Sequence, residues 1–279
     1  MVKFSLILAT IYREAEVEAF LDSLARQTYR NFELIVVDQN TDDRVANIVE
    51  RYAGYFPVRR VQCRPGLSIA RNMGIKLISG DIVAFPDDDC WYQPELLERV
   101  AQRFEDSNLE IISGQSRDMH HRHSQRSWPS EAHIADKVSI WKLAISYTVF
   151  MRRECVDAVG EFDEELGVGA ATAWQSGEET DFLIRALARG YSVRYFPELK
   201  VFHPQKTEVY NAATIERAKG YGAGLGRVLK KHHYPRWFVG YMLLRPLGGV
   251  LFSLLTLRIN KALYHLGVLR GRFKGWMAV

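Results

Sequence analysis

The stretch Ile82-Val-Ala-Phe-Pro-Asp-Asp-Asp89 runs from a short apolar segment directly into three consecutive carboxylates. A continuous apolar run of this length is typical of a strand that is buried on both faces. Three adjacent carboxylates repel one another and need a counter-cation. Hard cations such as Mg²⁺ or Mn²⁺ bind through one or two carboxylates together with substrate phosphates. The stretch therefore predicts a metal site, and the alternative is a solvated acidic turn that caps the next helix.

Strand-like and helix-like patterns alternate on either side of this stretch, over the first 115 residues. Strands are predicted over 4–9, 34–37, 58–61, 82–85 and 111–112, and helices over 14–26, 42–53, 67–78 and 94–104. Alternation with all-apolar strands predicts an α/β, Rossmann-like fold, with a mostly parallel sheet and helices on both faces. Ligands of such sheets bind beyond the carboxyl ends of the strands.

Polar residues stand at those carboxyl ends. Thr10, Asp38 and the triplet Asp87–Asp89 each follow a predicted strand, so we expect them to converge in space. Asp38 can accept hydrogen bonds from a ribose hydroxyl or a base N–H, or it can form an Asx turn. Arg71 can clamp a diphosphate bidentately, or it can form a surface salt bridge.

A second group of candidates lies near residue 178. Ser176 and Gly190 delimit a predicted helix over 178–189, and a strand over 191–196 follows. Glu178, Glu179 and Asp181 open that helix, where carboxylates either complement the helix dipole or act as a general base. Trp174, in a glycine-rich loop, can stack on an acceptor sugar. His203 is a structural histidine or a third metal ligand.

Cysteines and glycines exclude several other classes. Three widely spaced cysteines (Cys63, Cys90 and Cys155) favour neither a disulfide framework nor a zinc site, and they fit a reducing compartment. The N-terminal apolar run is too short for a signal peptide, so we expect the body to stay in the cytoplasm. Glycines at 220, 222, 224 and 226 follow no strand and do not form a nucleotide-binding loop.

The 279-residue chain has a formal charge of +4 that is unevenly distributed. Residues 217–279 hold twelve basic side chains and no acidic one, whereas the first 216 residues carry a net charge of −8. A basic tail of this kind indicates an anionic partner, either nucleic acid or membrane. No recognition helix or stacking motif accompanies the charge, so nucleic acid is the weaker alternative.

The tail also contains two apolar runs, Phe238–Leu244 and Pro246–Leu257, with Arg245 between them. Neither run reaches the ~20 residues of a membrane-spanning helix, and a joined helix would place an arginine and a proline at mid-bilayer. Two short apolar helices with basic flanks are therefore predicted, as an interfacial or re-entrant membrane anchor. An oligomerisation surface is the alternative.

Taken together, the motifs resemble the family 2 glycosyltransferases with the GT-A fold, in the order typical of that family and over about residues 4–204. The matching segments are Ser5–Thr10, Phe20–Thr28, Phe32–Asp38, Ala70–Gly74, Phe85–Asp89, Gly177–Asp181 and Gly190-Tyr191 through His203. The resemblance implies inverting transfer of a sugar from a UDP-sugar, with Mn²⁺ or Mg²⁺. The expected acceptor is a hydroxyl of a glycan or lipid-linked molecule, in the synthesis of cell-surface polysaccharide or glycolipid.

The resemblance also assigns roles to individual residues. It implies Glu179 as the catalytic base, one methylene longer than the usual Asp, so that Glu178 and Asp181 stay open as alternatives. The implied metal ligands are Asp89, His203 and Asp87. The implied nucleotide-sugar contacts are Ala9, Thr10, Tyr12, Glu14, Asp38, Arg71, Asn72, Asp87 and Asp88. The implied acceptor contacts are Trp174, Gln175 and Glu178.

These assignments divide the chain into a nucleotide-sugar-binding half over 1–115, an acceptor-binding and catalytic half over 116–212, and a helical extension over 213–279. We expect the protein at the cytoplasmic face of the membrane. A nucleotidyltransferase is a weaker reading, because residues 9–13 lack the glycines of a phosphate-binding loop. A non-catalytic sugar-nucleotide-binding module is a third.

Overall fold

The computed structural model describes residues 1–205 and 209–278. Within these residues the chain forms two compact units. The first comprises 1–65, 69–162 and 182–205, and the second comprises 66–68, 163–181 and 209–278. The segments 1–115, 116–212 and 213–279 were divided by their expected roles in ligand binding, not by their contacts, so this division stays a prediction.

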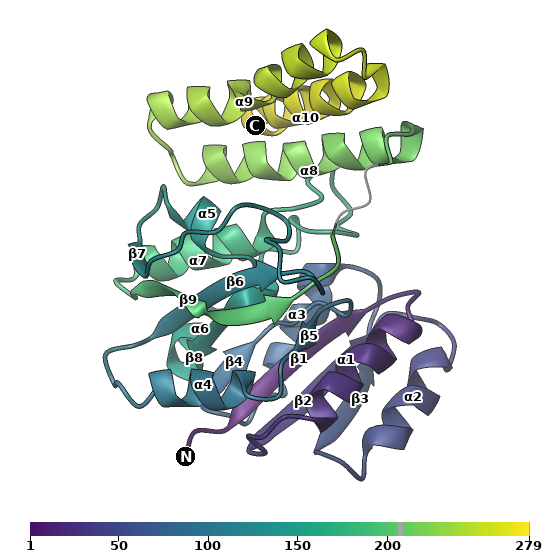
Figure 1. Cartoon of the computed structure of the whole chain (residues 1–279), viewed down its shortest axis with the longest axis vertical. Helices are drawn as coiled ribbons and strands as arrows, with labels where there is room; N and C mark the ends of the chain where they lie inside the picture. The colour runs from purple at the N-terminus through teal and green to yellow at the C-terminus, as the bar shows by residue number, and fades with distance from the viewer. Residues whose placement is uncertain (206–208, 279) are drawn as a thin grey trace. The chain divides into compact units, whose positions relative to one another are not determined.

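The first unit is built on one sheet, whose strands lie in the order β3, β2, β1, β4, β8, β6, β9, β5, with β7 paired to β9 (Figure 1). Their bounds are β1 Phe4–Thr10, β2 Phe32–Asp38, β3 Val58–Gln62, β4 Ile82–Ala84, β5 Trp91–Tyr92, β6 Ile111–Arg117, β7 His133–Ala135, β8 Val149–Arg152 and β9 Val193–Phe202. The first four strands are mutually parallel, as expected, whereas β8 runs antiparallel to both β4 and β6. The α/β fold with its parallel strands is confirmed, and short antiparallel pairings of β8, β5 and β7 make the sheet mixed.

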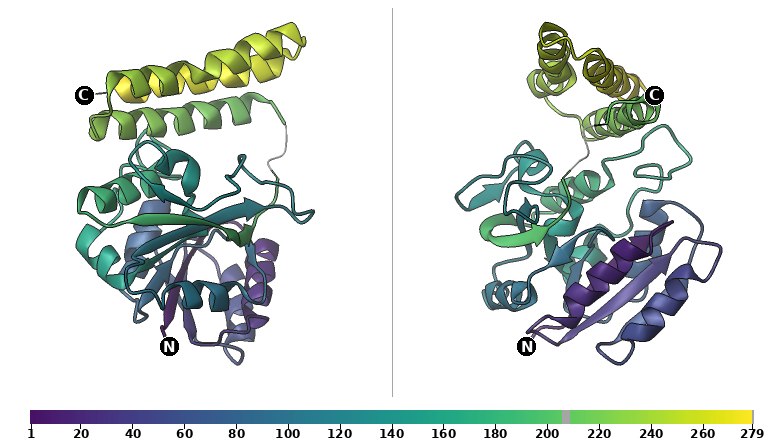
Figure 2. Two further views of the ribbon diagram at one scale, coloured as in Figure 1. Left: turned by 60° about the vertical axis from the view of Figure 1, so that its left-hand side comes forward. Right: turned by 45° about the vertical axis from the view of Figure 1, so that its right-hand side comes forward.

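Helices lie on both faces of this sheet (Figure 2). Their bounds are α1 Ala15–Ala25, α2 Arg44–Tyr52, α3 Leu67–Ile75, α4 Leu96–Arg103, α5 Ile140–Leu143, α6 Arg153–Val159 and α7 Glu178–Ala188, with a 3₁₀ turn η1 at Ser146–Thr148. The expected helices are present, with ends that differ by a few residues. The strand predicted over 191–196 instead continues through Pro197 to Phe202. The pairing of β6 with β9 shifts register opposite the proline, because Ser113 pairs with Tyr195 but Gln115 pairs with Lys200.

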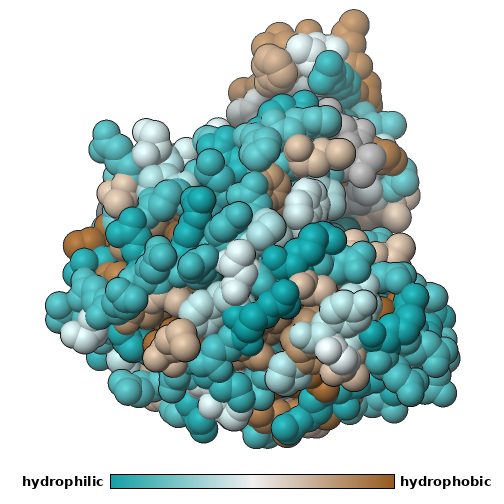
Figure 3. Space-filling view, turned by 60° about the horizontal axis from the view of Figure 1, so that its bottom comes forward, coloured by the Kyte–Doolittle hydropathy of each residue, from teal (hydrophilic) through white to brown (hydrophobic). Residues whose placement is uncertain are grey.

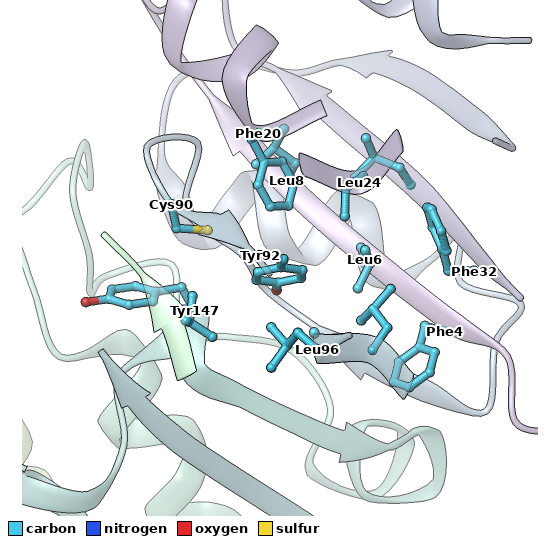
Figure 4. Packing of buried hydrophobic residues seen from close by; sticks show 14 of the residues in the cluster. Phe4, Leu6, Leu8, Phe20, Leu24, Phe32, Cys90, Tyr92, Leu96 and Tyr147 are labelled. Carbon is cyan, nitrogen blue, oxygen red and sulfur yellow. The ribbon is translucent and has the colours of Figure 1, made fainter. Parts of the chain in front are cut away.

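Alternating side chains of β1 fill the two faces of the sheet. Phe4, Leu6 and Leu8 lie in a buried hydrophobic cluster, together with Phe20 of α1 (Figure 4). Ile7 points to the opposite face, where α3 approaches so closely that a Cβ on Gly74 would overlap the isoleucine side chain. Burial on both faces explains why the strand reads as a continuous apolar run.

The second unit contains three long helices, α8 Ala212–Lys231, α9 Arg236–Leu255 and α10 Ile259–Met277. The prediction of two short apolar helices is wrong here, because α9 runs unbroken through Arg245 and Pro246. Pro246 has no N–H to donate to the carbonyl of Met242, one turn earlier. A guanidinium N–H of Arg272, on α10, donates to that carbonyl instead, so the proline leaves no buried acceptor unsatisfied.

The glycines spaced by two along α8 serve two different faces of that helix. Gly222 and Gly226 face α10, where an added Cβ would overlap backbone atoms of Val268 and Arg272. Gly220 and Gly224 face the opposite way, towards residues 173–176. Helical geometry explains the pattern, because residues two apart point about 200° apart.

Candidate active site

The carboxyl ends of the parallel strands meet as their sequence positions predict. Thr10 lies opposite Asp38 in the pairing of β1 with β2, and Ala9 forms a bridge with Asp87 beyond the end of β4. Polar side chains from three strand ends therefore share one edge of the sheet.

Asp87, Asp89 and His203 form a group that can hold a metal ion. One ligand atom from each lies within 4.8 Å of the others, and each residue is only partly buried. Nε2 of His203 lies 3.0 Å from Oδ1 of Asp89. Two carboxylates and one imidazole match the donor set of a hard or borderline divalent cation. His203, which comes from the end of β9, thus lies with the triplet that precedes β5.

Arg13 and Thr10 also contact the acidic triplet. Nη1 of Arg13 lies 2.9 Å from Oδ1 of Asp88 and 2.6 Å from Oδ2 of Asp89. The Thr10 hydroxyl donates to Oδ2 of Asp88 at 2.7 Å. Burial raises the pKa of Asp88 to about 7, although Arg13 and Thr10 oppose this shift. The guanidinium thus supplies positive charge that partly offsets the mutual repulsion of the carboxylates.

His203 is oriented by groups on both of its sides. Its Nδ1 lies 2.7 Å from the carbonyl oxygen of Pro204, and its ring stacks on Tyr147 with centroids 4.9 Å apart. A proton on Nδ1 directed at that carbonyl leaves Nε2 facing Asp89. Burial raises the pKa of Asp89, but His203 and Arg13 outweigh this effect and lower it to about 2. Asp89 is therefore ionised at neutral pH.

Asp38 is fully buried and already carries several hydrogen bonds. Its Oδ1 accepts from the backbone N–H and the side-chain amide of Asn40, and its Oδ2 accepts from Nε of Arg60 at 2.8 Å. The bond to the Asn40 backbone is the Asx-type contact considered from the sequence. Arg60 was not predicted, since a partner 22 residues away in the chain leaves no local pattern.

Arg71 and its neighbour Asn72 lie on α3, and both are 2% exposed. Nη2 of Arg71 lies 3.5 Å from Oδ1 of Asp87, and the guanidinium carbon lies 5.4 Å from the centre of the Phe162 ring. The side chain of Asn72 exchanges hydrogen bonds with the backbone of Phe162. Asn72 thus has a structural contact in the fold, and Arg71 lies beside one of the candidate metal ligands.

The other predicted nucleotide contacts lie just after β1. Tyr12 has a left-handed backbone (φ 58°), a 75% exposed side chain and a backbone N–H that donates to Asn40. Glu14 is exposed and lies 3.7 Å from Arg44. Between them, Arg13 is the side chain that reaches the acidic triplet, and it is not among the contacts predicted from the sequence.

The base candidates belong to the second compact unit, at the start of α7. Glu178 is 5% exposed and lies beside Gly167, whereas Glu179 is partly exposed. Asp181 is fully buried, and its Oδ1 lies 2.7 Å from both Nζ of Lys231 and Nε2 of His232. This environment favours a structural role for Asp181 over that of a base.

The predicted acceptor contacts lie in the loop before α7. The guanidinium of Arg227 lies 4.4 Å from the centre of the Trp174 ring, so a cation already covers one face of this aromatic. The amide of Gln175 donates to the carbonyls of Ala170 and Thr172 and accepts from the N–H of Gly169. Gln175 therefore holds its own loop together, and acceptor contact by either residue stays a prediction.

Comparison with known proteins identifies the family. The model of glycosyl transferase family 2 matches residues 5–157, more than half of the chain. An aligned segment of 109 residues is 38% identical to an uncharacterized glycosyltransferase of Haemophilus influenzae and covers 39% of this chain and 37% of that protein. AglE, a glycosyltransferase of Haloferax volcanii, is 26% identical over 73% of this chain and 67% of its own length. The chain belongs to glycosyl transferase family 2.

Solved structures share the fold at low identity. The mannosyltransferase PcManGT of Pyrobaculum calidifontis, in complex with GDP-Man and Mn²⁺, has a TM-score of 0.68 at 16% identity and covers 99% of this chain and 87% of its own. S. aureus TarS 1–349, in complex with UDP-GlcNAc, has a TM-score of 0.62 at 18% identity over 98% of this chain and 91% of its own. These neighbours confirm the GT-A-like fold. The chain spans about a third of the Haemophilus relative and two thirds of AglE.

Proposed function

We propose that the protein transfers a sugar, with inversion, from a UDP-sugar to a hydroxyl of a glycan or lipid-linked acceptor. The observation that carries this proposal is the group Asp87, Asp89 and His203, at the sheet edge that also holds Thr10 and Asp38. A nucleotide-sugar donor also agrees with the neighbours, since PcManGT is in complex with GDP-Man and TarS 1–349 with UDP-GlcNAc.

The residues present fit a divalent cation, Mn²⁺ or Mg²⁺, held by Asp87, Asp89 and His203. When bound, the cation supplies positive charge to the leaving diphosphate. Asp89 is ionised at neutral pH and ready to coordinate, and His203 is oriented by the Pro204 carbonyl. Arg71 lies close enough to Asp87 to orient this ligand, in addition to any contact with the diphosphate.

The acceptor half of the reaction is assigned to Glu179. Of the three carboxylates at the start of α7, it is the one that is partly exposed. Its carboxylate takes the proton of the acceptor hydroxyl as the hydroxyl oxygen bonds to the anomeric carbon. The bond between that carbon and the diphosphate oxygen breaks at the same time, and the nucleoside diphosphate leaves.

The test is a screen of nucleotide-sugars for metal-dependent release of nucleoside diphosphate, with and without EDTA. Release of UDP from a UDP-sugar in the presence of Mn²⁺ supports the proposal, and anomeric inversion is read from the product by NMR. Release of GDP instead would move the donor to the GDP-sugars. Formation of pyrophosphate would indicate nucleotidyl transfer and contradict the proposal.

We further propose that helices α9 and α10 bind the cytoplasmic surface of an anionic membrane as a peripheral or monotopic anchor. Large apolar side chains of α9 are exposed along one stripe, namely Trp237, Tyr241, Leu244, Leu251 and Leu255. Figure 3 shows one face of the molecule coloured by hydropathy, with hydrophobic residues gathered at its upper end. Exposed basic residues accompany them without any acidic residue, namely Arg236, Arg245, Arg258, Arg270 and Lys274.

A surface-lying helix agrees better with these features than a spanning one. By length and composition α9 is long and apolar enough to cross a membrane, but a third of its most apolar window is buried within the protein. Arg245 and Pro246 also lie at its middle, where charge is costly in a bilayer. Exposed apolar area beside basic side chains is the pattern of interfacial binding to anionic lipid.

The membrane proposal is tested by flotation with vesicles of phosphatidylcholine alone and with about a third phosphatidylglycerol. Binding to the anionic vesicles, and loss of binding in the double variant Leu251→Ser/Leu255→Ser, supports it. A protein that ignores both vesicles and forms a concentration-dependent oligomer, which the same double variant disrupts, would assign the surface to a second copy of the chain.

A further inference from the structure

The segment from Trp174 to Asp181, which carries the acceptor and base candidates, is held along helix α8. The backbone N–H of Gln175 donates to the carbonyl of Gly220 at 3.1 Å. The hydroxyl of Ser176 donates to the carbonyl of Tyr221 at 2.8 Å. The segment and the helix therefore run side by side, within one compact unit.

Glycines make this close approach sterically feasible. An added Cβ on Gly224 would overlap the backbone and the hydroxyl of Ser176. Gly177, at the turn into α7, has a φ of +94°. A Cβ added to it would lie only 2.8 Å from the side chain of Val228. A residue with a side chain at either glycine would force the segment away from α8.

The C-terminal end of α8 also contacts the same segment, through charged side chains. Lys231, the last residue of α8, and His232, its C-cap, both lie 2.7 Å from Oδ1 of Asp181. Nζ of Lys231 also lies 2.7 Å from Oδ2 of Asp163. Asp181 is fully buried, so its carboxylate has to keep partners inside the protein.

We propose that Lys231 and His232 are positioning residues for the catalytic base, and that they act through Asp181. Asp181 follows Glu179 by two residues in the first turns of α7, so fixing its carboxylate fixes the backbone that carries Glu179. The inference rests on the proposed function for the identity of the base. It gives α8 a role in the reaction itself, separate from any anchoring by α9 and α10.

The first experiment separates positioning from donor binding. In Lys231→Met and His232→Ala, we expect kcat for the nucleotide-sugar found in the screen to fall by about tenfold or more, with the donor KM within about twofold. Calorimetry with Mn²⁺ plus UDP, and with Mn²⁺ plus GDP, should give unchanged Kd values. The controls are His233→Asn, which changes a neighbouring histidine, and Lys76→Met, which changes an exposed lysine of the first unit, and both should leave kcat unchanged.

The second experiment needs no turnover. Hydrogen–deuterium exchange of the amides over 175–181 should accelerate by about tenfold in Lys231→Met and His232→Ala, and the control variants should match the parent protein. His232→Gln keeps an N–H donor at a similar place, so it should restore slow exchange and most of kcat.

The outcomes distinguish this inference from the proposed function. If no nucleotide-sugar is turned over by the parent protein, the proposed function fails, whereas the exchange data still decide whether Lys231 and His232 hold the segment. Unchanged exchange over 175–181 in both variants overturns the inference. Loss of nucleotide binding in parallel with kcat overturns it as well, because the two residues would then act on the whole fold.

Discussion

The assignment of Asp89 as a metal ligand leads to a direct prediction about Mn²⁺ binding. Asp89→Ala should weaken Mn²⁺ binding by roughly a hundredfold or more, because even outer partners of a metal cost 10–100-fold when they are lost. Isothermal calorimetry measures the affinity. Glu50→Gln, an exposed carboxylate on α2, is the matched control and should bind Mn²⁺ as the parent protein does. Equal affinity in Asp89→Ala would remove this residue from the metal site.

The assignment of Glu179 as the catalytic base leads to a second prediction, about turnover. Glu179→Gln should keep the affinity for Mn²⁺ and nucleoside diphosphate but lower kcat by about 10²–10⁴, the contribution expected of a general base. Single-turnover kinetics with the active nucleotide-sugar measures the chemical step. If Glu178→Gln shows this loss and Glu179→Gln does not, the base is the buried neighbour.

Residues at strand ends were predictable because the strand positions alone bring them together. Thr10, Asp38 and the triplet Asp87–Asp89 needed only the parallel sheet to meet at one edge. Arg13 and Arg60 were not predictable, since an arginine contacts whichever carboxylate its long side chain reaches, and here that carboxylate is 22 or more residues away.

At the scale of elements, the contact between α8 and α10 depends on glycine. Gly271→Ala should lower the free energy of unfolding by about 1–3 kcal/mol, because the new Cβ overlaps the carbonyl of Lys219. Gly248→Ala on α9 is the matched control, since its Cβ would have nothing within 4 Å. The control should gain up to ~1 kcal/mol from helix propensity. Chemical denaturation measures both, and equal effects would contradict the close contact.

The junction of β1, β2 and β4 makes a pH-dependent prediction. Glu33 on β2 accepts hydrogen bonds from Ser5 and from the backbone and hydroxyl of Ser79. Burial alone would raise the pKa of Glu33, but these bonds and Lys3 lower it below its usual 4.5. A carboxyl with a depressed folded-state pKa stabilises the protein above its unfolded pKa, and this stability is lost as the pH falls.

Glu33→Gln should therefore lower the free energy of unfolding at pH 7, and the difference from the parent protein should shrink below about pH 4.5. Urea unfolding at pH 7, 5.5 and 4 measures it. A difference that is constant with pH would mean that the stabilisation comes from packing rather than from the charge of the carboxylate.

Several of the elements that the sequence did not predict are short or interrupted. β8 and β7, with four and three residues, are held in place by their neighbours in the sheet and carry no periodic pattern of their own. In α9, the arginine and proline at 245–246 favour a helix end in the sequence. The hydrogen bond from Arg272 of α10 to the carbonyl of Met242 explains why the helix continues. Both cases depend on a partner distant in the chain, which a local pattern cannot contain.

At the scale of the whole molecule, the uneven charge of the chain leads to a prediction about membranes. The triple variant Arg245→Gln/Arg258→Gln/Arg270→Gln should bind anionic vesicles roughly a hundredfold more weakly, at about 1 kcal/mol for each basic residue. Raising the salt concentration should also weaken the binding of the parent protein to anionic vesicles. Flotation measures both effects, and affinity that depends on neither change would leave the apolar stripe as the whole of the interaction.

The charge of the tail that is available to a partner differs from the count of its basic residues. Some basic residues of the tail neutralise carboxylates of their own unit, as Lys231 does for Asp163 and Asp181. The part of the tail available to an outside anion is therefore smaller than its twelve basic residues. It lies in α9, α10 and the turn between them, where no acidic residue is present.

The hydrogen bond from Arg272 to the carbonyl of Met242 determines how far the chain can be shortened. A truncated protein that ends before residue 272 would still contain all of α9, yet the carbonyl left without a donor by Pro246 would lose its replacement. Such a protein would expose apolar surface of α9 as well as an unsatisfied acceptor. Deletion series should therefore remove α9 and α10 together.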